Sequence, residues 1–465
     1  MSGWAKAGLL AALLGAGALR LSLARHRYFD TDELEHLHAA LLVSHGNVPF
    51  RDFFEHHGPA FWSLIAPAAA APADPYDKAL AGRAVVSVFW LMSLALAARG
   101  RRGASPYEAP LAAAMLAWFG AFAQKSLEVR PDVPAAFLAA GAAWMIARPA
   151  AWSGQWAGLL FGAALWFSPK ALFPGLGLAL GAAWRRSERA GPNEALRLLG
   201  GFAAGAAAAG AAGALYFAAQ GGLGKLWSYY VLYNAGFPGA RVAWSATLLP
   251  SLLSDPLIWL AGLLGLRRWR ERPEEAGALV FTVLGLAATP SAYPQHLLFA
   301  APFLASFAAA EVLGWVRAAP ARGRGLWSRG GRGALAAAAL ACSFAVTART
   351  AWGRIGEGNA LQRERWECAS AHVPENGAVW DVWTGDAFHR PHASFLWFVP
   401  GDSQNYYEPK ALEEQFIAGL ASKKTVAAIR CESCLRRVPP SVVSAFDLLY
   451  EPTGCGRLWT RRKGT

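Results

Sequence analysis

Charged side chains are scarce in this sequence. Aspartate, glutamate, lysine and arginine make up only 16% of its 465 residues, against about a quarter in water-soluble proteins, while hydrophobic residues make up 55% and the mean hydropathy is +0.25. Apolar runs close to the ~20 residues needed to cross a bilayer recur along most of the chain. The shortage of charge therefore excludes an ordinary soluble domain and predicts an α-helical polytopic membrane protein.

Acidic residues are rarer than basic ones, 31 against 44, which gives a formal net charge of +13. In a soluble domain this excess would suggest a nucleic-acid partner. Here the arginines gather in short loops between apolar runs, at 99–102, 185–189, 267–270 and 317–332, and the positive-inside rule explains them. We therefore expect no nucleic-acid partner and place these loops on the cytoplasmic side.

A cleavage site for a signal peptide is also missing. The first apolar segment, 7–24, runs directly into Arg25-His26-Arg27 without a small-x-small pattern, so we interpret it as a retained span. The alternation of basic and other loops then predicts about eleven transmembrane helices within residues 1–351, with a first outer loop at 25–80. We expect a multi-pass protein of the inner (plasma) membrane.

No further spanning run follows residue 352, and no internal repeat or heptad run is present. Residues 352–465 have mixed charge with Pro and Gly, and short apolar segments at 377–383 and 424–429 are typical of buried strands. A helical pattern covers 409–420 between them. We predict a small α/β extracytoplasmic C-terminal domain.

Cysteine is rare, and four of the five cysteines lie in this C-terminal part: Cys368, Cys431, Cys434 and Cys455. In an oxidising compartment they can form disulfides, whose pairing the sequence does not determine. Cys431-x-x-Cys434 alone could instead belong to a zinc or redox site, although no clear second pair accompanies it. Cys342 lies in the last span, where we expect it to pack.

The polar residues that the chain does have crowd into the first outer loop, at 28–59. Carboxylates and imidazoles alternate there, and helical spacing puts Asp32, Glu35 and His36 on neighbouring faces of a helix along the membrane surface. For Glu35, His36 and His38, a solvated interfacial helix explains the pattern as well as a functional site does.

The order of motifs in this loop resembles the GT-C class of membrane glycosyltransferases. The Asp32-Glu33 pair is followed by a surface helix and then by the stretch 48–59, as in the branch (glycosyltransferase family 39-like) of protein O-mannosyltransferases and the lipid A aminoarabinose transferase. Weaker matches lie at the outer ends of later spans: Arg130-Pro131-Asp132, Ser168-Pro169-Lys170 and Tyr293-Pro294-Gln295-His296. The resemblance covers the membrane part of the chain.

The resemblance implies transfer of a sugar from a polyprenyl-phosphate-linked donor to a lipid, glycan or protein acceptor at the outer face. The catalytic base of the family falls on Asp32, with Glu33 beside it and Asp132 as the acidic residue of the second outer loop. Asp30 is the alternative if the register differs, and we expect it to contact substrate. Glu55 is the acidic residue of the second motif in the first loop.

The proposed chemistry needs one base and several cations. A carboxylate can take the proton of an acceptor hydroxyl as it attacks the anomeric carbon, and backside attack inverts the sugar. The phosphate that leaves needs positive charge rather than an acid, and Arg130, Lys170 and His296 can supply it. For Arg130 and Lys170, interfacial snorkelling is the alternative interpretation.

Two questions stay open in the sequence. We expect Glu55 and His56 to contact substrate, although at His56-His57-Gly58-Pro59 the chain departs from the Lys-Pro-Pro of the aminoarabinose branch. No cofactor is predicted, although Asp30, Asp32, Glu55 and His56 are residue types that could bind a divalent metal.

Two other classes of protein compete with the enzyme. A polytopic transporter or lipid flippase would place its polar groups near the bilayer midplane, often within repeated halves. A non-catalytic scaffold would not need the Asp-Glu pair. The charged residues here gather at the outer ends of spans, which favours chemistry at the membrane surface.

Overall fold

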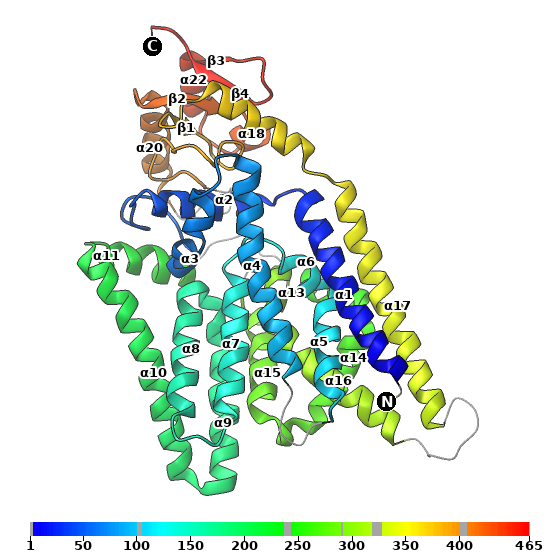
Figure 1. Ribbon diagram of the computed structural model, residues 1–465. Coiled ribbons are helices and arrows are strands. Elements are labelled where there is room, and N and C mark those ends of the chain that lie inside the picture. Colours follow the sequence, from blue (N-terminus) through cyan, green and yellow to red (C-terminus); the bar gives the residue numbers. More distant parts are fainter. Residues whose placement is uncertain are drawn as a thin grey trace.

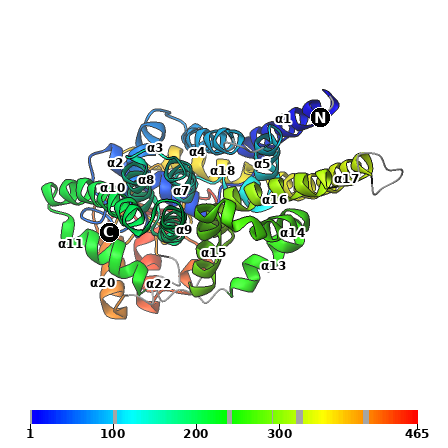
Figure 2. The same cartoon turned by 90° about the horizontal axis from the view of Figure 1, so that it is seen from below.

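The protein is described by a computed structural model covering residues 3–99, 105–236, 243–289, 292–318, 328–399 and 407–464. Long helices run side by side in a bundle, and a small unit containing a sheet lies at one end, above the short helices α2 and α3 (Figure 1). The N-terminus lies at the opposite end of the bundle. Seen along the helices, α8, α9 and α10 group on one side, while α1 and α17 lie on the other (Figure 2).

Each apolar stretch interpreted as a span is helical in the structure. The helices of the bundle are α1 (Gly3–His26), α4 (Pro75–Ala98), α5 (Glu108–Trp118), α6 (Gly120–Lys125), α7 (Asp132–Ile146), α8 (Ser153–Phe167), α9 (Leu172–Ala190), α10 (Pro192–Ala219), α13 (Trp244–Ser254), α14 (Pro256–Gly265), α15 (Pro273–Ala288), α16 (Ala301–Arg317) and α17 (Arg329–Gly356). Between α10 and α13 lie α11 (Leu223–Leu226), the π-helical turn η2 (Trp227–Leu232) and α12 (Tyr233–Ala235). Short 3₁₀ turns are η1 (Pro169–Ala171), η3 (Leu266–Glu271) and η4 (Pro294–Phe299).

Four of these helical segments are by themselves long and apolar enough to cross a membrane: Lys6–His26, Pro75–Ala98, Pro192–Ala219 and Gly330–His372. A fifth span is possible if the pair Ser245–Ser254 and Pro256–Glu271, bent by 101°, crosses as one. The total of about eleven therefore stays a prediction. Parts of two basic loops on which the orientation rests, 100–104 and 319–327, lie outside the described residues.

The C-terminal unit contains the expected strands and helix. Its sheet has the order β1-β2-β4-β3, in which β1 and β2 are parallel and the other pairs antiparallel. The strands are β1 (Ala378–Trp380), β2 (Thr425–Ile429), β3 (Tyr450–Pro452) and β4 (Leu458–Arg461), and the helices are α18 (Ala360–His372), α20 (Pro409–Ala421), α21 (Glu432–Leu435) and α22 (Pro440–Leu449). The strand predicted at 424–429 and the helix at 409–420 are thus confirmed. The strand predicted at 377–383 is present but ends at Trp380.

Two disulfides complete this unit. Cys368 pairs with Cys455, which joins α18 to the residues before β4, and Cys431 pairs with Cys434 at the end of β2. Of the alternatives that the sequence left open for these four cysteines, the structure has disulfides. Cys342 was expected to pack, but its side chain is exposed on α17, so that expectation is wrong.

Helix α2 (Thr31–Ser44) lies between the bundle and the C-terminal unit, packed against α3 (Pro59–Ala70) (Figure 1). Its residues from Glu33 to Leu42 are all buried. The interpretation of Glu35, His36 and His38 as residues of a solvated interfacial helix is therefore wrong. The C-terminal unit covers His38, whereas His57 and Trp62 lie against Glu35 and His36.

Candidate active site

The site is built on the first turn of α2. Asp30 is the N-cap residue, and its Oδ1 accepts a hydrogen bond of 3.1 Å from the backbone N–H of Asp32. The carboxylate of Glu33 accepts in return from the N–H of Asp30, at 3.0 Å. This capping box satisfies N–H groups that the helix itself leaves without partners. The capping box fixes the backbone of the helix start at Asp32, whose side chain is 34% exposed.

Glu33 points in the opposite direction, into the bundle. Its Oε1 accepts from Arg83 Nη2 at 2.7 Å, and its Oε2 accepts from Arg83 Nε at 3.0 Å and from the backbone N–H of Val129 at 3.1 Å. Both charged side chains have no exposed surface. With the N–H of Asp30 as a fourth donor, the carboxylate is fully engaged in holding α2 against α4 and the loop before α7.

Arg130 binds three carboxylates at once. Its guanidinium donates to Asp32 Oδ2 at 2.5 Å, to Asp30 Oδ1 at 2.9 Å and to Glu128 Oε2 at 2.6 Å, and only 6% of its side chain is exposed. Burial by itself would raise the pKa of Asp32, but the charge of Arg130 outweighs it and lowers that pKa. The interpretation of Arg130 as a snorkelling side chain is wrong, because its charge is directed at these three carboxylates.

Glu128 holds the segment that carries Arg130. Its Oε1 accepts from Arg27 Nη2 at 2.6 Å and from Lys125 Nζ at 2.7 Å, and its carboxylate has no exposed surface. Burial would raise its pKa, but Arg130, Lys125 and Arg27 together lower the pKa of Glu128 well below its usual range. Sequence reasoning missed Glu128, although an acidic residue two positions before Arg130 in an outer loop was a visible signal.

A second charged group lies at the start of α7. The Oδ1 of Asp132 accepts from the hydroxyl of Ser168 at 2.9 Å and from Lys170 Nζ at 3.2 Å. Asp132 is buried, whereas 27% of the Lys170 side chain is exposed. His296, buried on η4, is close enough to both for their charges to act on it. The structure thus brings together three predicted residues from distant outer loops.

The second motif of the first loop, at 48–59, lies close to Ser168 because Gly58 packs against the backbone of Phe167. A Cβ on Gly58 would lie 2.2 Å from the carbonyl oxygen of Phe167, so only glycine allows the loop to approach the end of α8, directly before Ser168. Just before Gly58, the backbone N–H groups of His56 and His57 donate to Glu55 Oε2, at 3.0 and 3.4 Å.

Glu35 and Glu55 form a buried carboxyl pair beside His57. The Nδ1 of His57 lies 3.2 Å from Glu55 Oε2 and 3.9 Å from Glu35 Oε1. Burial and the charge of Glu55 raise the pKa of Glu35 well above its usual value. Burial also acts on Glu55, but bonding to His57 outweighs it and lowers the pKa of Glu55. The pair therefore holds one carboxyl group with a raised pKa beside one with a lowered pKa.

These residues, with His56, form a group that could bind a metal. One ligand atom from each of Glu35, Glu55, His56 and His57 lies within 4.8 Å of the others. Carboxylate oxygen and imidazole nitrogen together suit zinc or a related divalent ion. Of the metal ligands considered from the sequence, Glu55 and His56 belong to this group. Asp30 and Asp32 do not, because they are bonded to Arg130.

The three groups form one site. The charges of His57 and Arg130 both act on Asp32, that of Arg130 also acts on Asp132, and that of Lys170 acts on His56. The structure adds three residues to those predicted from the sequence: Glu35, His57 and Glu128. Helix α2, which carries Asp32 and Glu35, lies at the end of the bundle that the C-terminal unit covers (Figure 1).

The C-terminal unit holds α2 from its far side. His38 Nδ1 bonds the carbonyl oxygen of Phe388 at 2.6 Å, and His38 Nε2 lies 2.8 Å from His392 Nδ1. Burial lowers the pKa of His38 to about 4, so the ring is neutral. No local signal in the sequence indicated this contact, because Phe388 and His392 lie 350 and 354 residues after His38.

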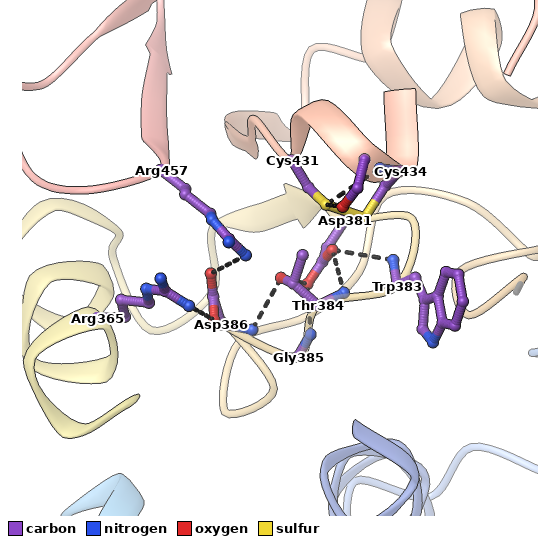
Figure 3. Close-up of a disulfide and its surroundings, with 10 residues drawn as sticks. Arg365, Asp381, Trp383, Thr384, Gly385, Asp386, Cys431, Cys434 and Arg457 are labelled. Carbon is purple, nitrogen blue, oxygen red and sulfur yellow. Dashed lines mark hydrogen bonds and ion pairs between the residues drawn. A yellow bond between two sulfur atoms is a disulfide. The ribbon is translucent and has the colours of Figure 1, made fainter. Parts of the chain in front are cut away.

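A turn after β1 makes a further contact with α2. The carboxylate of Asp381 accepts from the backbone N–H groups of Trp383, Thr384 and Gly385 at 2.8 to 3.1 Å, next to the Cys431–Cys434 disulfide (Figure 3). Gly385 has a φ of +70°, and a Cβ there would lie 2.6 Å from Cβ of Leu34 on α2. The turn therefore rests directly on the helix that carries Asp32.

Comparison with known proteins gives the fold a context. No family model and no curated protein matches the sequence. Among solved structures, ArnT from Cupriavidus metallidurans bound to undecaprenyl phosphate is similar with a TM-score of 0.64 at 12% identity, over 99% of this chain and 98% of that one. The Archaeoglobus fulgidus oligosaccharyltransferase in its apo form is similar with a TM-score of 0.56 at 13% identity, over 100% of this chain and 76% of that one.

Both neighbours are GT-C proteins, and their similarity extends over the bundle and the C-terminal unit together. The resemblance inferred from the first outer loop is thereby confirmed. This chain has the GT-C fold of membrane glycosyltransferases.

Proposed function

We propose that this protein is a membrane glycosyltransferase that moves a sugar from a polyprenyl-phosphate carrier to an acceptor at the outer membrane face, with inversion and with Asp32 as general base. The observation that carries the proposal is the position of Asp32. Its side chain is 34% exposed, against 23% for Asp30, 3% for Asp132 and none for Glu33 and Glu128. Asp32 is the carboxylate of this group that a substrate can reach best.

Arg130 prepares Asp32 for this role. It binds Oδ2, which leaves Oδ1 of Asp32 to accept a hydrogen bond from an acceptor hydroxyl. The lowered pKa keeps the carboxylate ionised at neutral pH. A weak base of this kind accepts the proton late, as the new bond to the anomeric carbon forms and the hydroxyl becomes acidic.

Lys170 is the cation best placed to bind the phosphate that leaves. Arg130 is neutralised by three carboxylates, whereas Lys170 bonds Asp132 and keeps 27% of its side chain exposed. A charge-assisted hydrogen bond from Lys170 Nζ would stabilise the developing phosphate, with His296 nearby as a further donor. We therefore propose Arg130, Glu33 and Asp30 as residues that position Asp32, and Lys170 as a donor-binding residue.

The neighbours support the class of donor and acceptor. One of the ArnT structures contains undecaprenyl phosphate. The archaeal oligosaccharyltransferase AglB has been solved in complex with an inhibitory peptide and a dolichol-phosphate, and that structure has a TM-score of 0.50 to this chain. We propose a donor of the same chemical class here. We also propose a membrane domain at 1–351, a C-terminal domain at 352–465 outside the inner (plasma) membrane, and the cytoplasmic side for the basic loops.

The test is an assay of the purified protein with polyprenyl-phosphate sugars and candidate acceptors, in which released polyprenyl phosphate is measured. Asp32→Asn should abolish release while leaving the elution volume and thermal unfolding unchanged. Asp52→Asn is the matched control, because Asp52 lies in the same loop and pairs with the exposed Arg51. Full release by Asp32→Asn would overturn the assignment, and lipid movement across vesicles without any release would instead indicate a flippase.

A further inference from the structure

Asp255 is a buried carboxylate that the proposed reaction does not use. It lies between α13 and α14 in the helix bundle, at a break where the two helices are bent by 101°, and it has no exposed surface. An ionisable residue within a membrane-spanning bundle is costly and usually has a specific purpose.

The carboxylate of Asp255 bridges two broken helices. Its Oδ2 accepts a hydrogen bond of 2.9 Å from the backbone N–H of Gly120, the first residue of α6. The chain breaks there between α5 and α6, where Phe119 adopts an extended conformation. A Cβ at position 120 would lie 2.9 Å from the same oxygen, so any larger residue there would displace the carboxylate.

Neutral groups supply the remaining contacts of this carboxylate. The hydroxyl of Ser254 lies 3.0 Å from Oδ2, and that of Thr347 on α17 lies 3.4 Å from Oδ1. Thr347 also bonds the carbonyl oxygen of Trp118, at the end of α5, at 2.9 Å. Asp255 and Thr347 together therefore satisfy an N–H and a C=O group that the α5–α6 break frees inside the bundle.

Helix α6 leads directly to the candidate active site. It ends at Lys125, whose Nζ bonds Glu128 at 2.7 Å, and Glu128 in turn bonds Arg130 at 2.6 Å. Arg130 then binds Asp32. A displacement of α6 would thus be transmitted to the guanidinium that orients the proposed base.

We propose that Asp255 is a positioning residue of this site: it caps α6 from another part of the bundle and thereby sets the position of Lys125, Glu128 and Arg130. The proposal rests on the function proposed above. It requires a hydrogen-bond acceptor at position 255 but no negative charge, because the partners of the carboxylate are N–H and O–H groups.

The test compares three variants. Asp255→Asn keeps an acceptor for the N–H of Gly120, Asp255→Ala removes it, and Glu274→Ala removes another buried carboxylate, which pairs with Arg185 at the far end of the bundle. Two quantities are measured for each: hydrogen–deuterium exchange of segment 120–130, and the pH dependence of kcat/KM for polyprenyl-phosphate release.

Asp255→Ala should raise exchange in segment 120–130, lower kcat/KM about tenfold or more, and move the acid limb of the pH profile to higher pH, because Arg130 holds Asp32 less firmly. Asp255→Asn should match the wild type within about twofold, and Glu274→Ala should leave the exchange of 120–130 and the acid limb unchanged. Equal losses in the Ala and Asn variants, or wild-type exchange and acid limb in Asp255→Ala, would overturn the proposal. The exchange measurement decides it even if the wild type transfers no sugar, an outcome that would refute the proposed function alone.

Discussion

Arg130 and Asp32 form an ion pair of 2.5 Å between residues that lie 98 positions apart in the sequence. The arginine comes from the loop before α7 and the aspartate from the first turn of α2. From the sequence, Arg130 was expected to bind the phosphate that leaves and Asp32 the hydroxyl of the acceptor. Their contact instead makes the arginine part of the environment that sets the ionisation of the proposed base.

The first prediction concerns the pH dependence of transfer. Arg130 lowers the pKa of Asp32, so the base is ionised above that pKa and activity falls as the pH drops through it. Arg130→Gln removes the positive charge, and the acid limb of kcat/KM should move to higher pH by about one unit or more. Arg51→Gln, which alters an exposed arginine of the first outer loop, should leave the limb in place. An unshifted limb in Arg130→Gln would separate Arg130 from the base.

The second prediction concerns donor binding by Lys170. Removing one charge-assisted hydrogen bond to a phosphate costs about 1.5–3 kcal/mol, so Lys170→Ala should weaken binding of polyprenyl phosphate roughly 10- to 100-fold. Lys78→Ala is the control, because Lys78 Nζ bonds the carbonyl oxygen of Ala69 outside this group. Binding can be followed by the quenching of tryptophan fluorescence. An unchanged affinity would return Lys170 to the class of snorkelling lysines.

Stability should depend on the buried pair of Arg83 and Glu33. Neither side chain has exposed surface, and Arg83→Ala would leave the Glu33 carboxylate buried without its cation, at a cost of about 3–5 kcal/mol. The expected result is a marked fall of the unfolding temperature in detergent. Arg197→Ala removes an exposed pair with Glu194 and should change that temperature very little. Similar falls for the two variants would contradict the buried role.

The two disulfides should differ in their contribution to stability. Cys368–Cys455 closes a loop with a sequence separation of 87 residues, and Cys431–Cys434 one of 3. The chain-entropy model assigns the long loop about 4–5 kcal/mol and the short loop about 2 kcal/mol. Paired Cys→Ser replacements should therefore lower the unfolding temperature of the C-terminal unit more at 368 and 455 than at 431 and 434. The reverse order would show that contacts other than loop closure dominate.

Much of the fold could be predicted because its signals are local. Apolar runs gave the helices of the bundle, and short β-rich segments gave β1 and β2. The pair Asp32-Glu33 and the motifs around Asp132 and Lys170 indicated where the site lies. The burial of Glu35, His36 and His38 could not be predicted, since it depends on how distant segments fold back onto α2. His38 meets residues 350 and 354 positions later in the chain, and His57 and Trp62 lie against Glu35 and His36.

The sequence by itself determined which segments are apolar enough to form the bundle and which loop collects the carboxylates and imidazoles. Only the tertiary structure decided which carboxylate meets which cation: Glu33 with Arg83, Asp132 with Lys170, and Asp32 with Arg130. The physical reason is the separation along the sequence of the residues that interact. Helix formation and caps depend on neighbours within a few residues, whereas these ion pairs join residues 38 to 98 positions apart, and their energies depend on burial that the folded chain alone creates.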